Sequence, residues 1–492
     1  MKDLKARAIR GGLAKVCSQG ANFALRIGSL MALARLLDPK DFGLVGMVTA
    51  FTGVLNLFRD FGLSSATIQR EEVTDEQVSV LFWINTLVGI TISLLIVIAS
   101  PFVAIFYREP RLLWVTIALA SGFFFNAIGV QHSAILQRHM RFTALALIDT
   151  IALVFSIIVG ISMALHGFKY WSLVAMTIAV PLVTSILLWF TSGWVPGTPR
   201  RQTGTRAMMK FGGTMTLNGL VVYVAYNLEK VLLGRFWGAE TVGIYGRAYQ
   251  LINIPTDNLN SSAGGVAFAA LSKLQSEPSR ISSYFLKGYS LVLSLTVPIT
   301  FGCALFADDM ISVFLGPKWG AAITVFRLLA PTMLAFAILN PFGWLLSSLG
   351  LVGRNLKINL ALAPVMIAGY LLGLPYGPKG VAFAYSAVMT LCMIPLIIWV
   401  LHSTVITVRD ILVVVSRPLC SCIVAAGVAL GLQLVYGPLL SALPRLVIGV
   451  TLLFGTYVGM LLCVMGQGSF YLDILHGLLR RSSLEEKVLE PV

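Results

Sequence analysis

Fourteen apolar stretches, each roughly twenty residues long, fill most of the sequence and decide its fold class. A helix of that length can cross a bilayer because it satisfies its own backbone hydrogen bonds there. Charged residues make up only 12% of the chain, whereas soluble domains carry about 25%. The sequence therefore predicts an all-α integral membrane protein with about fourteen transmembrane helices. The expected helices cover residues 11–36, 42–62, 79–104, 112–136, 143–165, 170–193, 208–234, 241–268, 286–306, 321–348, 355–373, 380–402, 411–436 and 444–466.

The spacing of these stretches predicts two lobes. Residues 1–194 hold the first six helices, a polar cytoplasmic linker covers 195–207, and residues 208–402 hold the next six. Residues 403–467 add two helices, and 468–492 form a polar cytoplasmic tail. Paired six-helix lobes are a common transporter plan, with the substrate site where the repeats meet.

A weak internal repeat supports this plan. A shift of 200 residues aligns residues 34–46, ARLLDPKDFGLVG, with residues 234–246, GRFWGAETVGIYG. Under this shift Arg35, Gly43 and Gly46 fall on Arg235, Gly243 and Gly246. The identities gather around one expected turn, which indicates that the two lobes are related.

Basic residues indicate how the chain lies in the membrane. The formal charge is +15, and in a soluble protein such an excess would suggest nucleic acid. Here the Lys and Arg residues are loop anchors that face anionic lipid, and cytoplasmic loops carry more of them. We therefore expect membrane lipids as partners, no nucleic acid, and both termini in the cytoplasm. The side that holds the termini and the even-numbered loops includes Lys2, Lys5, Arg7, Arg10, Arg138, Arg141, Arg200, Arg201, Arg206, Lys273, Arg280, Arg480 and Arg481.

The sequence lacks the motifs of common enzymes. It contains no P-loop, no HExxH, no nucleophile elbow and no His/Cys cluster with metal-site spacing. Asp308 and Asp309 resemble half of an acidic metal site, but they lie in a short external loop without a third ligand in view. We expect no catalytic residues, no metal, no cofactor and no enzymatic activity.

The first expected helix carries a polar stripe. Four of its polar residues fall within about 60° of one another at 100° per residue. A stripe of this kind in a membrane helix usually lines a cavity. These residues are Lys15, Gln19, Asn22 and Arg26.

The seventh expected helix carries a second stripe. Tyr223, Asn227 and Lys230 lie on neighbouring positions of one face. Glu229 points about 100° away from Lys230, so we expect its charge partner on another helix, with Arg247 or Arg26 as the candidates.

The eighth expected helix is the most polar. Gln250, Asn253 and Asp257 follow one stripe, and Arg247 stands at its start. Across the three helices cations outnumber acids, and Lys and Arg are the usual ligands of phosphate groups. The stripes therefore predict an anionic substrate, such as a phosphate or diphosphate, in a central cavity.

Four stretches resemble a known family. They are residues 32–51, ALARLLDPKDFGLVGMVTAF; residues 134–152, AILQRHMRFTALALIDTIA; residues 226–255, YNLEKVLLGRFWGAETVGIYGRAYQLINIP; and residues 311–330, ISVFLGPKWGAAITVFRLLA. Over residues 5–400 the chain resembles the Wzx-type flippases of bacterial surface polysaccharides, in the multidrug/oligosaccharidyl-lipid/polysaccharide exporter superfamily.

The resemblance implies a V-shaped bundle that alternates access in the bacterial inner membrane. It implies a substrate too: an oligosaccharide repeat unit on undecaprenyl diphosphate, moved from the cytoplasmic to the periplasmic leaflet for exopolysaccharide, capsule, lipopolysaccharide or O-antigen assembly. Repeat-unit glycosyltransferases and a polymerase would be partners. By location, the resemblance carries head-group binding to Lys15, Arg26, Lys230 and Arg247.

Two questions stay open at this level. Glu229 and Asp257 are either charge partners or coupling carboxylates for a proton or sodium ion. The alternatives to a flippase are an ion-coupled multidrug antiporter of the same superfamily, which should favour an acidic and aromatic cavity, and a polymerase or ligase of lipid-linked sugars. That enzyme would be expected to carry a large periplasmic loop, and the longest external gap is around residues 306–320.

Overall fold

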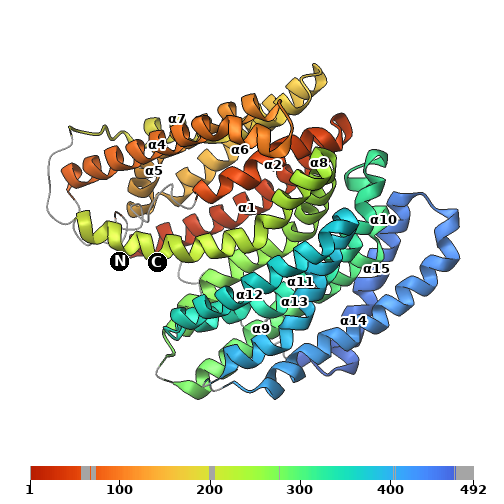
Figure 1. Ribbon diagram of the computed structural model, residues 1–492. Helices are drawn as coiled ribbons and strands as arrows, with labels where there is room; N and C mark the ends of the chain where they lie inside the picture. Colours follow the sequence, from red (N-terminus) through yellow and green to blue (C-terminus); the bar gives the residue numbers. More distant parts are fainter. Residues whose placement is uncertain are drawn as a thin grey trace, which may run out of the picture. The chain divides into compact units, whose positions relative to one another are not determined.

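The computed structural model of the protein describes residues 2–56, 67, 74–198, 205–275, 277–402, 404, 406–469 and 471. Every regular element within these ranges is a helix (Figure 1). The long helices are α1 Lys2–Leu36, α2 Pro39–Asn56, α4 Asp75–Tyr107, α5 Leu112–Arg138, α6 Phe142–Leu165, α7 Tyr170–Ser192, α8 Thr205–Ser272, α9 Pro278–Leu305, α11 Gly320–Ser348, α12 Val352–Gly373, α13 Gly377–Leu401, α14 Val408–Tyr436 and α15 Ala442–Gly459. Short turns of helix are α10 Ala307–Phe314, η1 Pro317–Trp319, η2 Leu374–Tyr376, η3 Gly437–Leu439 and η4 Met460–Val464.

The all-helical membrane fold expected from the sequence is confirmed. Each expected segment overlaps a helix of the structure. Within the described residues, nine helical runs are long and apolar enough to cross a membrane, judged by length and composition. The protein is therefore a multi-pass membrane protein, and the number of fourteen crossings stays a prediction.

The longest helix contains a break that the sequence also indicates. α8 joins the seventh and eighth expected helices, and Gly238 interrupts it with φ 83° and ψ 179°. Only glycine adopts this backbone region without strain. Gly238 therefore ends one helix and starts the next, between the predicted boundaries at residues 234 and 241.

Two compact units make up the structure. The first comprises residues 1–247, 314–322 and 359–384, and the second comprises residues 248–313, 323–358 and 385–492. This division differs from the two lobes expected on either side of the 195–207 linker, and the boundaries of those lobes stay a prediction.

Small residues allow the helices of the first unit to pack closely. α4 packs on α5, α5 and α6 both pack on α7, and α1 packs on α6. A Cβ on Gly89 of α4 would collide with Ala127 of α5. Close approach through small residues is typical of helix packing in membranes, where lipid is as apolar as the side chains.

In the second unit, α9, α14 and α15 pack together. A Cβ on Gly449 of α15 would collide with the ring of Phe306, which directly precedes α10. The sequence predicted a short external loop where the structure has α10. Asp309 of α10 is 1% exposed, and Arg445 of α15 donates from Nε to its two carboxylate oxygens at 2.8 and 2.9 Å. This partly buried ion pair links α10 to α15.

Candidate functional site

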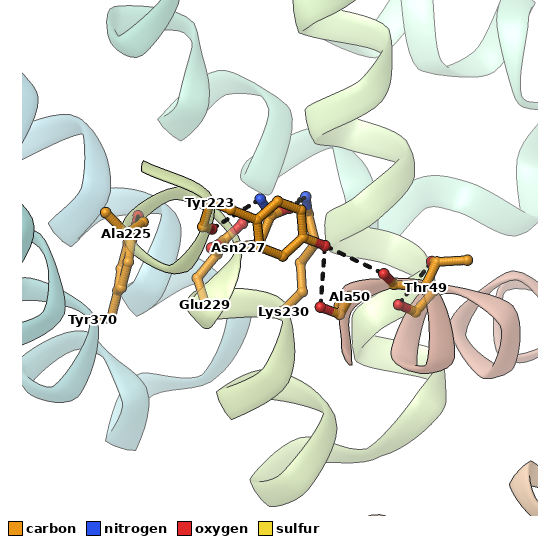
Figure 2. Close-up of polar contacts among 9 residues, drawn as sticks. Thr49, Ala50, Tyr223, Ala225, Asn227, Glu229, Lys230 and Tyr370 are labelled. Atoms are coloured by element: carbon orange, nitrogen blue, oxygen red, sulfur yellow. Dashed lines mark hydrogen bonds and ion pairs between the residues drawn. The ribbon is translucent and has the colours of Figure 1, made fainter. Parts of the chain in front are cut away.

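The stripe predicted on the first half of α8 is a connected polar cluster. The Asn227 side chain donates from Nδ2 to the Tyr223 carbonyl at 3.1 Å, and Lys230 donates from Nζ to Asn227 Oδ1 at 2.9 Å (Figure 2). Tyr223, Asn227 and Lys230 therefore share one face, as the sequence predicted. The Lys230 side chain is 19% exposed, so the ammonium is half-buried and held by a neutral amide.

Tyr223 connects this cluster to α2. Its hydroxyl donates to the carbonyl oxygens of Ala50 at 3.1 Å and Thr49 at 3.3 Å (Figure 2). A Cβ on Gly53 would collide with the Tyr223 hydroxyl, so glycine at position 53 leaves room for the ring. On its other side α8 is fixed by Tyr370 of α12, whose hydroxyl donates to the Ala225 carbonyl at 3.1 Å.

We expect Tyr223→Phe to lower the free energy of unfolding by about 0.5–1.5 kcal/mol, because the change removes a hydroxyl bonded to the α2 backbone while the ring stays in place. Thermal unfolding of the purified protein in detergent measures the loss. Tyr284→Phe is the matched control, since Tyr284 is exposed. Equal stability of the two variants would contradict a structural role for the Tyr223 hydroxyl.

The prediction for Glu229 is wrong in one respect. The carboxylate is completely buried, and its Oε1 lies 3.7 Å from Lys230 Nζ, the neighbour with which no pair was expected. The long, flexible lysine stem turns the ammonium back toward the carboxylate although the two Cα–Cβ bonds diverge. Neither Glu229 oxygen accepts a hydrogen bond from the described residues. The Glu229 carboxylate therefore interacts with the Lys230 ammonium as an ion pair without a hydrogen bond between them.

Arg247, at the start of the eighth expected helix, lies over an aromatic ring. Its Cζ is 4.4 Å from the centroid of Phe42 on α2, well inside the range of a cation–π contact. Phe42 packs edge-on against Trp319, with centroids 5.4 Å apart, and Trp319 Nε1 donates to the Ala34 carbonyl at 2.9 Å. Sequence reasoning placed Arg247 in the site but missed this aromatic support, because its members are far apart in the chain.

The polar stripe on α1 lies partly within the described residues. Gln19 and Arg26 are exposed and Asn22 is half-buried, while the Lys15 side chain lies outside the described residues. The Arg26 carbonyl accepts a hydrogen bond from Ser29 Oγ at 2.9 Å. Ionisable side chains within membrane helices usually face the interior of the bundle or a water-filled cavity.

The stripe on the second half of α8 begins the second unit. Gln250 is exposed and Asn253 is half-buried, and the Asp257 side chain lies outside the described residues. The structure thus brings together Tyr223, Asn227, Glu229 and Lys230. The joining of these residues with the α1 stripe and with Gln250 and Asn253 in one cavity stays a prediction.

The two aspartates at the start of α10, Asp308 and Asp309, each form an ion pair with an arginine. Asp308 pairs with Arg327 of α11, and Asp309 pairs with Arg445. No cluster of three or more His, Cys, Asp or Glu side chains suited to a metal ion occurs in the part of the chain that the structure describes.

Comparison with known proteins identifies a family. Residues 32–324 match the model of a family described as polysaccharide biosynthesis protein. The teichuronic acid biosynthesis protein TuaB of Bacillus subtilis is 30% identical over 338 residues, which cover 68% of both chains. The lipopolysaccharide biosynthesis protein WzxC of Escherichia coli is 25% identical over 75% of this chain and 77% of its own.

Solved structures show the same fold at low identity. The lipid II flippase MurJ, in an inward closed conformation, superposes with a TM-score of 0.74 at 13% identity, over 94% of this chain and all of its own. A multidrug resistance MATE transporter in an inward-facing conformation superposes with a TM-score of 0.61 at 15% identity, over 77% of this chain and 94% of its own.

Proposed function

The chain belongs to the polysaccharide biosynthesis protein family, and from this premise we propose that it is a flippase for lipid-linked oligosaccharides. Its substrate would be a repeat unit on undecaprenyl diphosphate, carried from the cytoplasmic to the periplasmic leaflet of the bacterial inner membrane. Relatives named for teichuronic acid and lipopolysaccharide biosynthesis support a polysaccharide precursor as the cargo. Both termini would lie in the cytoplasm, and the protein would act without catalysis.

The observation that carries the proposal is the half-buried Lys230 ammonium. It is positioned by a neutral amide at 2.9 Å and balanced by a carboxylate at 3.7 Å without a hydrogen bond. A lysine ammonium donates N–H groups to anions, and charge-assisted bonds to phosphate are among the strongest available to a protein. Lys230 would therefore bind the diphosphate, together with Arg26 and Arg247.

The Glu229–Lys230 pair also suggests how transport is coupled. A buried carboxylate is costly once its cation is engaged elsewhere. When the diphosphate takes up the Lys230 charge, Glu229 would bind a proton or a sodium ion, and it would release that ion when the substrate leaves. Asp257 is the other candidate for this role.

A strain that lacks the gene tests the function. We expect lipid-linked repeat units to accumulate on the cytoplasmic leaflet, and the restored gene to clear them. Extraction of labelled glycolipids, with leaflet assignment by an impermeant periodate reagent, measures both effects. If no glycolipid accumulates and drug sensitivity changes instead, the multidrug antiporter takes the place of the flippase; accumulation of flipped but unpolymerised units would indicate a polymerase or ligase.

A further inference from the structure

The interface between α4 and α5, within the first compact unit, contains four buried polar side chains that the candidate site does not use. These residues are Asn85 and Thr86 of α4 and Gln131 and His132 of α5, and each is at most 7% exposed. Two contacts fix the register of the helices. A Cβ on Gly89 would collide with Ala127, and the ring of Phe82 lies 5.9 Å from that of His132. Asn85 and Thr86 lie between Phe82 and Gly89 along α4, so they face the turn of α5 that carries the other two.

Several polar atoms of these four residues have no hydrogen-bond partner among the residues that the structure describes. They are Asn85 Oδ1 and Nδ2, Thr86 Oγ1, Gln131 Nε2 and His132 Nε2. Thr67 donates from its hydroxyl to Gln131 Oε1 at 3.0 Å, which leaves Nε2 as the unpaired end of that amide. A buried polar group without a hydrogen bond is costly, and in native proteins such groups usually bind an ordered water.

The contacts of His132 identify its second ring nitrogen as an acceptor. Nδ1 lies 2.8 Å from Ser192 Oγ. Ser192 donates its own proton to the Trp189 carbonyl at 3.3 Å, so its oxygen accepts the proton of Nδ1. In a neutral imidazole Nε2 then carries a lone pair. The rings of Trp189, Trp194 and Phe82 lie around the imidazole, with centroids 4.5, 5.3 and 5.9 Å away. Only a molecule inside the bundle can therefore reach this lone pair.

We propose that these four residues form a buried water site, in which an ordered water molecule bridges α4 and α5. The unpaired atoms identify the occupant by their chemistry. A metal cation needs acceptors and an anion needs donors. Here Asn85 Oδ1 and His132 Nε2 accept, whereas Asn85 Nδ2 and Gln131 Nε2 donate. Water both donates and accepts, and a buried water makes about three such hydrogen bonds.

Replacing the Asn85 amide by a leucine of similar size tests the water site through the sign of the effect on stability. In an occupied site, Asn85→Leu removes partners of the water and leaves Gln131 Nε2 and His132 Nε2 unpaired. The thermal midpoint of the purified protein in detergent should then fall by about 2–4 °C. In a dry site the same change removes an unpaired buried amide, so the midpoint should rise. A higher midpoint would overturn the proposal.

Hydroxyl-radical labelling by X-ray irradiation detects the water directly. Irradiation makes radicals from bound water, so a ring beside a buried water is oxidised although it is shielded from solvent. We expect labelling of Phe82, which is 3% exposed, and its loss in Asn85→Leu. Phe306, which is completely buried and outside the water site, should stay unlabelled. Mass spectrometry of the digested protein measures both rings.

Thr86→Val provides a smaller change of shape if Asn85→Leu fails to fold. It removes a hydroxyl of the water site and should decrease the labelling of Phe82. Thr52→Val is the matched control, because Thr52 is 4% exposed and its hydroxyl donates to the Val48 carbonyl of its own helix at 2.9 Å. Labelling should be unchanged in this variant.

Three results would contradict an ordered water. The first is an unlabelled Phe82 in the native protein, and the second is unchanged labelling in both Asn85→Leu and Thr86→Val. The third is a midpoint that sodium chloride raises in the native protein but not in Asn85→Leu, when potassium chloride has no such effect, since a cation would then occupy the site. These readouts need no substrate, so they do not depend on the proposed function.

Discussion

We expect the Lys230→Ala variant to fail to clear lipid-linked sugar when it replaces the native gene, although it should reach the membrane at the wild-type level. On the proposed function, the change would remove charge-assisted bonds from Lys230 to the diphosphate, each worth about 1.5–3 kcal/mol. Since about 1.4 kcal/mol is a factor of ten in affinity, we expect roughly a ten- to hundredfold loss of transport. Quantified glycolipid accumulation, normalised to protein in the membrane, measures it.

Two controls keep this prediction falsifiable. Lys318→Ala removes a lysine that is 49% exposed in a surface ion pair and should leave transport unchanged. Lys230→Ala alone leaves the Glu229 carboxylate buried without a cation, which can reduce folding. The double variant Lys230→Ala with Glu229→Gln removes that penalty. Full clearance by the double variant at normal abundance would mean that the Glu229–Lys230 pair is structural and that the diphosphate binds elsewhere.

We expect Arg445→Ala to destabilise the protein by about 3–5 kcal/mol, because the change leaves the buried Asp309 carboxylate without its cation. Asp309 is 1% exposed and loses both Nε–H bonds in this variant. Thermal unfolding in detergent, followed by tryptophan fluorescence, should show a much lower midpoint for the variant. Transport per folded molecule should stay the same, because we place neither residue in the substrate site.

The adjacent residue provides the matched control. Asp308 pairs with Arg327, and both side chains are about half exposed, at 51% and 49%. Asp308→Ala should therefore cost at most about 1 kcal/mol, as exposed ion pairs do. Replacing Asp309 and Arg445 together by leucine should recover much of the loss, since no uncompensated charge remains. If both aspartate pairs proved equally costly to break, burial of Asp309 would not be the cause.

Much of the fold follows from the sequence because the bilayer leaves few choices. Apolar stretches of the right length must become helices, and the break in α8 at Gly238 follows from a short polar turn between two such stretches. α10 escaped prediction because its eight residues are too few for a periodic signal. Its position depends on the Asp309–Arg445 pair, whose members lie far apart in the chain.

The candidate site was predictable where it depends on helix geometry alone. The shared face of Tyr223, Asn227 and Lys230 follows from 100° per residue. The Glu229–Lys230 pair was missed because Cβ directions do not fix the end of a four-carbon side chain. The cation–π contact of Arg247 with Phe42 depends on how α2 crosses α8, and no spacing in the sequence encodes that crossing.

A reciprocal contact between the two halves has a consequence for the history of the chain: a Cβ on Gly43 would collide with the Ala239 carbonyl, and a Cβ on Gly243 would collide with the Pro39 carbonyl. A contact in which each partner offers the same patch to the other has the form of an isologous dimer interface. A half-length ancestor with one such glycine could have met a second copy of itself about a two-fold axis, and gene duplication with fusion would then have joined the copies. Fusion frees the halves to diverge: Leu30 and Met47 of the first half stand where the second half has Lys230 and Arg247. On this history, the positive charges of Lys230 and Arg247 were acquired by the second half after the first half had become its permanent partner.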